Sequence, residues 1–433
     1  MNTQKTFKVI TLGCSKNTVD SEYLIRQLKL NKVKVLWETH EELPENIIIN
    51  TCGFIEDAKM ESIDTIEYYL QLKHTGKIKR VYITGCLSQR YKEIFKQEYP
   101  DADGIYGVNE YKKLINDLHF QYFPAHLKER EITTGPVTAF LKIAEGCNRK
   151  CSFCAIPHIR GNHKSKPIED LIDEAKFLAT KGIKELILIS QDLNYYGVDI
   201  YKSHKLPELV KRLAELNLFK WIRLQYLHPA GFPLELLDIM QQYPQVCNYI
   251  DIPIQHISDK MLQIMNRGIT RKQTIDLLNL IRKKLPDASI RTTVLVGHPG
   301  ETYKEYKELK DFIKEFKFHK LGGFTYSHED HTPAFDKYND EVSKIAKTKR
   351  LNAIMESQME IATYWNEQLI GKTLQVLIEA QDNDNIYIGR TEYDSPEVDN
   401  EVIVKSTEKL TMGEWYSVKI TSASAYHIEG TKI

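Results

Sequence analysis

Short apolar, β-branched runs alternate with amphipathic stretches in the first quarter of the chain. The runs are FKVITLG (7–13), NIIINTCGFI (46–55), RVYITGC (80–86) and GIYG (104–107). The stretch DSEYLIRQLKL (20–30) has helical spacing and separates the first two runs. This alternation is typical of a parallel sheet covered by helices. We therefore predict an α/β domain over residues 1–130.

A second series of strand-like runs follows over residues 131–340. It comprises FLKIAEG (140–146), ELILISQD (185–192), WIRLQYLHP (221–229), NYIDIPIQH (248–256), RTTVLVGHPG (291–300) and LGGFTYSH (321–328). Helical stretches separate these runs, so we predict a partial TIM-type (βα)6 barrel with its active site at the strand ends. Polar groups follow most of the strands, namely Gln191, Asp192, His228, Gln255, His256, His298 and His328.

The remaining chain predicts a linking helix over residues 341–365 and a β-rich domain over 366–433. The last region has five strand-like segments and no helical period: TLQVLIEA, NIYIGRT, NEVIVKS, WYSVKITSA and AYHIEGT. Segments of this length and number predict a small antiparallel β-barrel, the size of an appended binding module.

Charge is unevenly distributed along the chain. The whole sequence has 59 basic and 59 acidic residues, but residues 366–433 hold 6 basic and 12 acidic ones. An acidic module is unsuited to RNA phosphates and favours a basic protein partner. We assign that role to the run EYDSPEVDNE (392–401), with a solvated loop without a partner as the alternative.

Composition indicates an intracellular protein without a membrane segment. No apolar run approaches the roughly 18 residues that a bilayer span requires, and the N-terminus has no apolar signal segment. Seven cysteines in 433 residues do not indicate a disulfide framework. We therefore expect a cytoplasmic location and cysteines that bind metal or act in catalysis.

Three of the cysteines stand in one short motif, EGCNRKCSFCAIP (145–157). Cys147, Cys151 and Cys154 have C-x3-C-x2-C spacing. Thiolates hold iron-sulfur clusters, and a four-iron cluster with only three of them keeps one iron open for a ligand. The alternative is a zinc site with His158 or His163 as the fourth ligand, although zinc sites commonly use paired C-x2-C motifs.

This motif, with Phe153 before its last cysteine, resembles the signature of radical S-adenosylmethionine enzymes. The resemblance implies a radical SAM barrel whose open iron binds S-adenosylmethionine, with Cys147, Cys151 and Cys154 as catalytic ligands. The stretch TTVLVGHPGET resembles the glycine loop that approaches the nucleoside in that superfamily, which implies cofactor contacts at Phe153 and at two glycines, Gly297 and Gly300. These glycines could equally be turn residues after a strand.

A second trio, Cys14, Cys52 and Cys86, follows three strands of the first domain. Because the ends of parallel strands meet at one sheet edge, we expect the three thiols to lie together. Their alternative role is as small buried apolar residues. TLGCSKNTVDSE, NTCGFIEDAKMES and TGCLSQRY resemble the N-terminal domain of methylthiotransferases. That family implies a flavodoxin-like sheet, a second four-iron cluster on this trio and a C-terminal TRAM-like barrel.

Within the family, two substrate classes are open. GCSKN, NTCGFI and IRLQYLHP resemble enzymes that act on an aspartate of small-subunit ribosomal protein S-twelve, whereas tRNA adenosine enzymes typically show GCQMN. Ser15 and Lys166 depart from the usual forms, but neither is a cluster ligand. The resemblance implies the ribosomal protein as substrate and an external electron donor, with tRNA as the alternative. A non-catalytic, zinc-stabilised binding scaffold is the alternative from another class.

Other chemistry-bearing residues receive structural roles. Radical abstraction needs no side-chain base in its first step, so we expect the four histidines at the strand ends, His228, His256, His298 and His328, to position groups rather than carry protons. The seventh cysteine, Cys247, precedes a strand in QVCNYIDIP and is expected to pack in the core.

Overall fold

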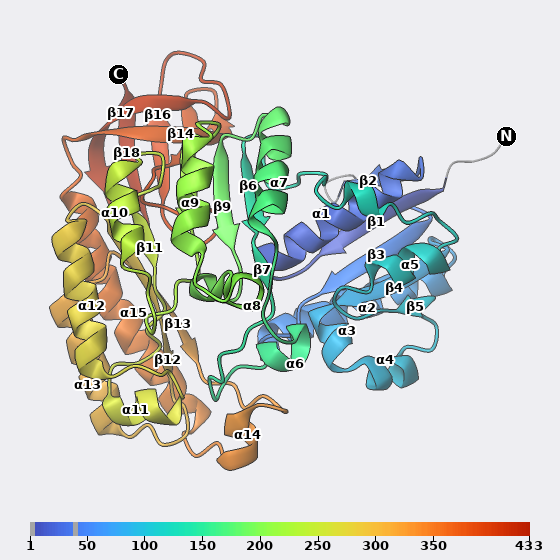
Figure 1. Ribbon diagram of the computed structural model, residues 1–433, viewed down its shortest axis with the longest axis horizontal. Coiled ribbons are helices and arrows are strands. Elements are labelled where there is room, and N and C mark those ends of the chain that lie inside the picture. Colours follow the sequence, from blue (N-terminus) through green and yellow to red (C-terminus); the bar gives the residue numbers. More distant parts are fainter. Residues whose placement is uncertain (1–4, 38–41) are drawn as a thin grey trace.

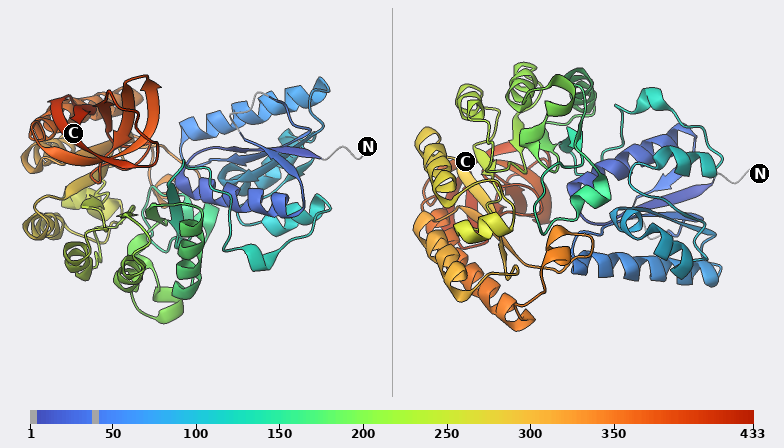
Figure 2. Two further views of the ribbon diagram at one scale, coloured as in Figure 1. Left: turned by 90° about the horizontal axis from the view of Figure 1, so that it is seen from above. Right: turned by 60° about the horizontal axis from the view of Figure 1, so that its bottom comes forward.

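The computed structural model describes residues 5–37 and 42–433. Residues 1–4 and 38–41, which belong to the predicted first domain, lie outside the described residues. Figure 1 shows an N-terminal α/β domain and a C-terminal barrel that both pack against a central core, and Figure 2 shows the same arrangement from two further sides. Within the described part of the chain, no helix is long and apolar enough to cross a membrane.

The N-terminal domain is a parallel five-stranded sheet in the order β2-β1-β3-β4-β5, as the flavodoxin-like prediction requires. Its central strand β3 is buried on both faces: Ile48 packs in the cluster that includes α1, while Ile47 and Ile49 pack in the cluster that includes α2. Burial on both faces explains the unbroken apolar run. The elements are β1 (Thr6–Thr11), α1 (Ser15–Leu30), β2 (Lys34–Leu36), β3 (Asn46–Thr51), α2 (Glu56–His74), β4 (Arg80–Gly85), α3 (Cys86–Arg90), α4 (Lys92–Glu98), β5 (Gly104–Ile105), α5 (Tyr111–Asp117) and the 3-10 turn η1 (Pro124–His126).

The core contains the six predicted parallel strands, arranged as two sheets, β6-β9-β10 and β11-β12-β13. A parallel bridge between Ile222 and Val246 joins them into a partial barrel. One apolar cluster runs through both sheets and their helices. The elements are β6 (Thr138–Lys142), β7 (Ala144–Glu145), α6 (Ile156–Arg160), β8 (Lys164–Ser165), α7 (Ile168–Thr180), β9 (Glu185–Ile189), η2 (Leu193–Tyr195), α8 (Val198–Tyr201), α9 (Leu206–Glu215), β10 (Trp221–Leu224), α10 (Glu235–Gln242), β11 (Tyr249–Asp251), α11 (Asp259–Ile264), α12 (Arg271–Lys284), β12 (Ser289–Val296), α13 (Tyr303–Phe316), β13 (Lys320–Thr325) and α14 (Pro333–Lys337).

The linking helix α15 (Lys344–Glu367) leads into a closed five-stranded barrel. The helix packs on the core, and its Ile354 and Ile361 join the core's apolar cluster. The barrel strands follow the order β14-β15-β16-β18-β17, and β16 pairs with β18 in parallel. The expected antiparallel barrel is therefore correct except at this one pair. Its strands are β14 (Thr373–Asn383), β15 (Ile386–Arg390), β16 (Glu401–Lys405), β17 (Trp415–Ala423) and β18 (His427–Lys432).

Buried ion pairs fix the N-terminal domain on the core. The Arg130 side chain is fully buried, pairs with Glu22 of α1, and donates from Nε to Glu174 of α7 over 3.0 Å. Tyr23 also donates to Glu174, over 2.7 Å. Loss of one partner from such a pair leaves an uncompensated buried charge and costs about 3–5 kcal/mol. The first turns of α1, and with them Cys14, are thereby held against the core.

Candidate active site

The three N-terminal cysteines follow three adjacent strands of one parallel sheet. Cys14 precedes α1 after β1, Cys52 follows β3, and Cys86 begins α3 directly after β4. Gly13 has a φ of +88°, and a Cβ on it would lie 2.6 Å from Cys52 Sγ. Gly53 approaches the backbone of Leu87 as closely, since a Cβ there would lie 2.7 Å from Leu87 Cα. The glycines beside the cysteines therefore let these loops meet.

The thiols of this trio influence one another electrostatically. Burial, with a smaller contribution from the neighbouring Cys14 and Cys52 thiols, raises the pKa of Cys86 to about 12 although Arg160 acts to lower it. Burial also raises the pKa of Cys52, with Cys14 adding to the effect. Cys52 and Cys86 are buried, whereas Cys14 is exposed. The structure thus brings together the second predicted trio, open to solvent on the Cys14 side.

Asn17 and Arg160 surround Cys86. The Cys86 thiol donates to Asn17 Oδ1 over 3.5 Å, and Arg160 Nη2 donates to Cys86 Sγ over 3.3 Å. Asn17 also donates to the carbonyls of Leu12 and Thr51, so it ties together the ends of two strands that carry cysteines. The sequence analysis did not single out either residue. Their position in or beside the two cysteine motifs is the only signal that the sequence holds.

The core trio, Cys147, Cys151 and Cys154, lies on the loop between β7 and α6. Cys147 N–H donates to the Gly161 carbonyl over 3.1 Å, and Cys154 N–H donates to the Cys151 carbonyl over 3.2 Å. Position 146 requires glycine, because its φ is +74° and a Cβ there would lie 2.3 Å from the Asn162 carbonyl oxygen. These contacts fold the C-x3-C-x2-C segment into a defined loop.

Donors from the barrel reach the sulfurs of this loop. Arg267 donates to Cys151 Sγ over 3.2 Å, and the Arg149 N–H donates to Cys147 Sγ over 3.3 Å. Burial raises the pKa of Cys147 to about 11 and that of Cys154 to about 12, and nearby thiols of the trio raise both. Metal binding requires the thiolate form, so these thiols give up their protons only when a cation replaces them. The donor set fits a thiolate-bound iron-sulfur cluster.

A single zinc ion is not supported by the geometry. Among the described residues, no three His, Cys, Asp or Glu side chains are grouped so that they could hold one metal ion. His163 instead lies 3.0 Å from Ser165 Oγ, and His158 lies beside the His331 ring. In a four-iron cluster each thiolate binds a different iron, so its cysteines need not converge on one point. The arrangement of the trios is thus compatible with the cluster interpretation, and both histidines considered for the zinc alternative have other neighbours.

The three predicted cofactor residues lie around one part of the barrel mouth. Phe153 packs with Met261, Met265 and Leu295, and its ring lies edge-on to His298. Gly297 and Gly300 both have positive φ, of +76° and +86°. A Cβ on Gly297 would lie 2.3 Å from the Lys347 side chain, so a turn and a close approach both require glycine there. Contact of Phe153, Gly297 and Gly300 with a cofactor stays a prediction.

The four histidines at the strand ends are held by neighbouring groups. Burial lowers the pKa of His228 to about 2 and lowers that of His298, so both are neutral at pH 7. His298 lies 2.9 Å from Ser152 Oγ, His328 lies 3.0 Å from the Tyr326 hydroxyl, and His256 accepts two backbone N–H groups. These contacts support positioning roles.

The remaining polar groups at the mouth pair with residues beside the Cys147 loop. Asp192 accepts from Arg149 Nε over 2.7 Å, and Gln191 donates to Glu145 over 3.0 Å. Gln255 has a φ of +66°, and its N–H donates to the Thr293 carbonyl. Cys247 is buried beside Trp221 and Tyr249, which confirms its packing role.

Two of the five acidic residues in the run 392–401 are engaged inside the protein, whereas Glu397 and Glu401 are exposed. Asp394 pairs with Lys320 over 2.7 Å, and Asp399 accepts from Arg291 and from the Tyr249 hydroxyl. Asp394 is buried where the barrel meets the core, and the side chain of Asp399 is only 2% exposed there. The expectation of a partner site on this run is wrong for these two carboxylates, and so is the alternative of a solvated loop, because their charges hold the barrel in place.

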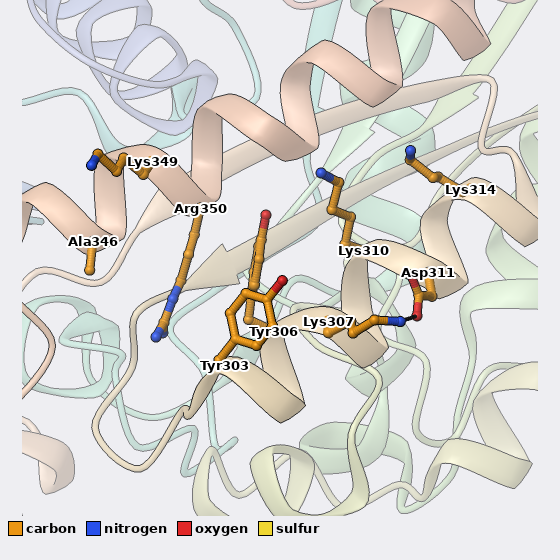
Figure 3. A pocket seen from close by; sticks show the side chains of 9 residues that line it. All are labelled: Tyr303, Tyr306, Lys307, Lys310, Asp311, Lys314, Ala346, Lys349 and Arg350. Atoms are coloured by element: carbon orange, nitrogen blue, oxygen red, sulfur yellow. Dashed lines mark hydrogen bonds and ion pairs between the residues drawn. The ribbon is translucent and has the colours of Figure 1, made fainter.

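A surface groove of about 550 Å³ lies between α13 and α15 (Figure 3), and no cysteine of either trio lines it. Its lining includes Tyr303, Lys310, Lys349 and Arg350, but none of the predicted site residues. Arg350 is held by Glu301, over 2.5 Å. The groove is therefore a feature of the outer surface and not the candidate active site.

Comparisons with known proteins agree with this geometry. Residues 141–313 match the Radical SAM superfamily, residues 370–433 match the TRAM domain, and residues 6–107 match an uncharacterized protein family, UPF0004. Among solved structures, the radical S-adenosylmethionine methyltransferase TsrM from Kitasatospora setae has a TM-score of 0.56 at 15% identity, over 76% of this chain and 77% of that one. The cobalamin-dependent radical enzyme OxsB has a TM-score of 0.54 at 14% identity, over 82% of this chain and 56% of that one. These two likenesses concern the fold.

The barrel and its cysteine loop thus define a radical S-adenosylmethionine enzyme with an N-terminal α/β domain and a C-terminal TRAM barrel. The ribosomal protein uS12 methylthiotransferase RimO of Christiangramia forsetii is 49% identical over 423 residues, 98% of this chain and 93% of that protein. RimO of Phocaeicola vulgatus is 47% identical over 426 residues, and the aligned region covers 98% of this chain and 98% of that protein. The chain belongs to the RimO family of methylthiotransferases.

Proposed function

We propose that this protein adds a methylthio group to the β-carbon of an aspartate in ribosomal protein uS12 by radical S-adenosylmethionine chemistry. The observation that carries the proposal is end-to-end similarity to relatives named uS12 methylthiotransferases, in a chain that folds with two separate cysteine trios. An external electron donor would reduce the enzyme.

We assign a 4Fe-4S cluster to each trio, on Cys147, Cys151 and Cys154 in the core and on Cys14, Cys52 and Cys86 in the first domain. When bound, the cluster on Cys147, Cys151 and Cys154 would supply the electron that cleaves S-adenosylmethionine to a 5′-deoxyadenosyl radical. The cluster on Cys14, Cys52 and Cys86 would carry the sulfur to be methylated. The chain's own part is to hold and screen the reacting groups. Its loop glycines position the thiols, and burial excludes water from Cys86 and Cys147.

We place S-adenosylmethionine against Phe153, Gly297 and Gly300. Phe153 belongs to the Cys147 loop and is partly buried, and Ser152 of the same loop lies 2.9 Å from His298, which stands between the two positive-φ glycines. The proposed division of labour among the parts of the chain is residues 1–130 for the second cluster, 131–340 for radical generation, 341–365 as the linking helix and 366–433 as the barrel. The neutral His228 and His298 serve as positioning groups in this scheme.

The alternatives have less support. The relatives named above are uS12 methylthiotransferases, and the net charge of −6 over residues 366–433 does not suit phosphate contacts with tRNA. A non-catalytic, zinc-stabilised scaffold does not agree with membership of a methylthiotransferase family.

An assay with both candidate substrates, uS12 and tRNA, tests the proposal. The anaerobically reconstituted protein is incubated with S-adenosylmethionine and reductant, together with purified uS12 or tRNA, and each is analysed by mass spectrometry for the methylthio group. Iron analysis should give about eight irons per chain, and about four after Cys147, Cys151 and Cys154 are all replaced by Ala. Modification of tRNA alone, or neither modification in the presence of eight irons, would contradict the proposal.

A further inference from the structure

Lys16 is a buried cation without a carboxylate partner. It is the second residue of α1, two positions after Cys14, and it is only 6% exposed. Across residues 5–37 and 42–433, no carboxylate lies within ion-pair distance of its Nζ. Asp20, one turn further along α1, is already paired with Lys142 and Arg160. A buried ammonium without an anion is unfavourable, because it has lost its water.

Among the residues that the structure describes, the one interaction partner of this ammonium is an aromatic ring. Lys16 Nζ lies 3.1 Å from the centroid of the Tyr226 ring. A cation over a ring face is attracted by the quadrupole of the ring, but this attraction recovers only part of the cost of burial. The protein therefore keeps an ammonium group that an anion could still stabilise.

Tyr226 places this ammonium at the mouth of the barrel. It follows β10, has a φ of +69° and donates its N–H to Asp251. The α1 helix lies against β6 of the core (Figure 1), so Lys16 reaches from the N-terminal cysteine trio toward the strand ends. A second unpaired polar atom occurs at the same strand end, since Nε2 of the buried His228 has no hydrogen-bond partner among the described residues.

We propose that Lys16 is a carboxylate-binding site and that its ligand is the side-chain carboxylate of the substrate aspartate. The inference rests on the proposed function. The β-carbon of aspartate is bonded directly to the carboxyl carbon, so an ammonium that holds the carboxylate also fixes the position of the reacting carbon. The compact ammonium with three donors suits one carboxylate, and binding pairs the buried charge. Lys16 thereby discriminates aspartate from the neutral, isosteric asparagine.

The test compares Lys16→Met, Lys16→Arg and a matched control, Lys349→Met, which removes the same charge from the exposed groove of Figure 3. The substrates are uS12 and a variant with Asn at the target aspartate. Loss of a charge-assisted hydrogen bond should raise the KM of Lys16→Met for uS12 by about 10- to 100-fold and remove its preference for Asp over Asn. Lys16→Arg should keep part of the preference, and the control should match the wild type.

Two further measurements separate binding from a structural role. Lys16→Met should keep its iron, and its melting temperature should stay level or rise, because an unpaired buried charge has been replaced by an apolar side chain. The affinity for S-adenosylmethionine, which carries a carboxylate of its own, should be unchanged. An active wild type whose Lys16→Met variant keeps its KM and its Asp preference would overturn the inference. So would loss of iron, a lower melting temperature or weaker S-adenosylmethionine binding. An iron-replete wild type that modifies no uS12 would refute the proposed function instead.

Discussion

Arg160 Nη2 donates a hydrogen bond to Cys86 Sγ over 3.3 Å, across the interface between the two domains that hold the cysteine trios. Arg160 ends α6, the helix that follows the Cys147 loop, and its side chain is buried. It also pairs with Asp20 and Glu145, over 3.1 and 2.8 Å. A single guanidinium therefore connects the loop of one trio to a sulfur of the other.

This contact predicts that Arg160→Gln changes the N-terminal cluster while the other trio stays intact. Hydrogen bonds to ligand sulfurs and nearby charge set the potential of iron-sulfur clusters, and loss of a cationic donor favours the oxidised form. The midpoint potential of the cluster on Cys14, Cys52 and Cys86 should fall in a redox titration followed by electron paramagnetic resonance. The exposed Arg212→Gln is the control, and equal potentials in both variants would contradict the argument.

Gly13→Ala should prevent assembly of the N-terminal cluster. The new Cβ would lie 2.6 Å from Cys52 Sγ at a φ of +88°, so the Cys14 and Cys52 loops must separate. Anaerobic reconstitution should give about four irons per chain instead of about eight. Gly76→Ala is the matched control, because Gly76 has a φ of +72° but no atom within 4 Å of the added Cβ. That variant should lose about 1 kcal/mol of stability and keep its iron. Loss of iron in both variants would contradict the argument, because strain at a positive φ would then be enough to prevent cluster assembly without the contact to Cys52.

The sequence predicts the parallel strands well because many of them are apolar runs buried on both faces, as β3, β6 and β9 show. It predicts that the cysteines meet because strand ends share an edge. The three-residue strand β2 was missed, since so short a run on a sheet edge has little apolar signal. The parallel pairing of β16 with β18 was also missed, because the choice of partner strand is made between segments distant in the chain.

The burial and the partners of the charged residues were the features that the sequence predicted least well. Asp399 stands in an acidic run, but its partners Arg291 and Tyr249 lie over 100 positions away, so a count along the chain misses the pairing. Lys16 and Arg160 are likewise ordinary basic residues in the sequence. Only the packing of α1 and α6 between the domains buries them and gives them a role.

Iron uptake should release protons. Burial raises the pKa of Cys147 to about 11 and that of Cys86 and Cys154 to about 12, so these thiols are protonated in the metal-free protein at pH 7. Each must lose its proton to bind iron, and apparent iron affinity should therefore rise with pH from 6 to 9. Chelator competition at several pH values measures this dependence. Affinity that is independent of pH would mean that the thiolates already exist before iron binds.

Acid should weaken the attachment of the C-terminal barrel through Glu185. Arg390 and Arg223 hold the pKa of this buried carboxyl at about 2, below its usual 4.5, in spite of the burial. A carboxyl with a depressed native pKa contributes stability that is complete above pH 4.5 and lost as the pH falls toward 2, here about 3 kcal/mol. The rings of Trp221 and Trp415 meet at 5.2 Å near this interface, so tryptophan fluorescence in urea should follow the loss. Glu185→Gln should be less stable at pH 7 and should lose less on acidification. A variant whose acid dependence equals that of the wild type would place the sensitivity in another carboxyl.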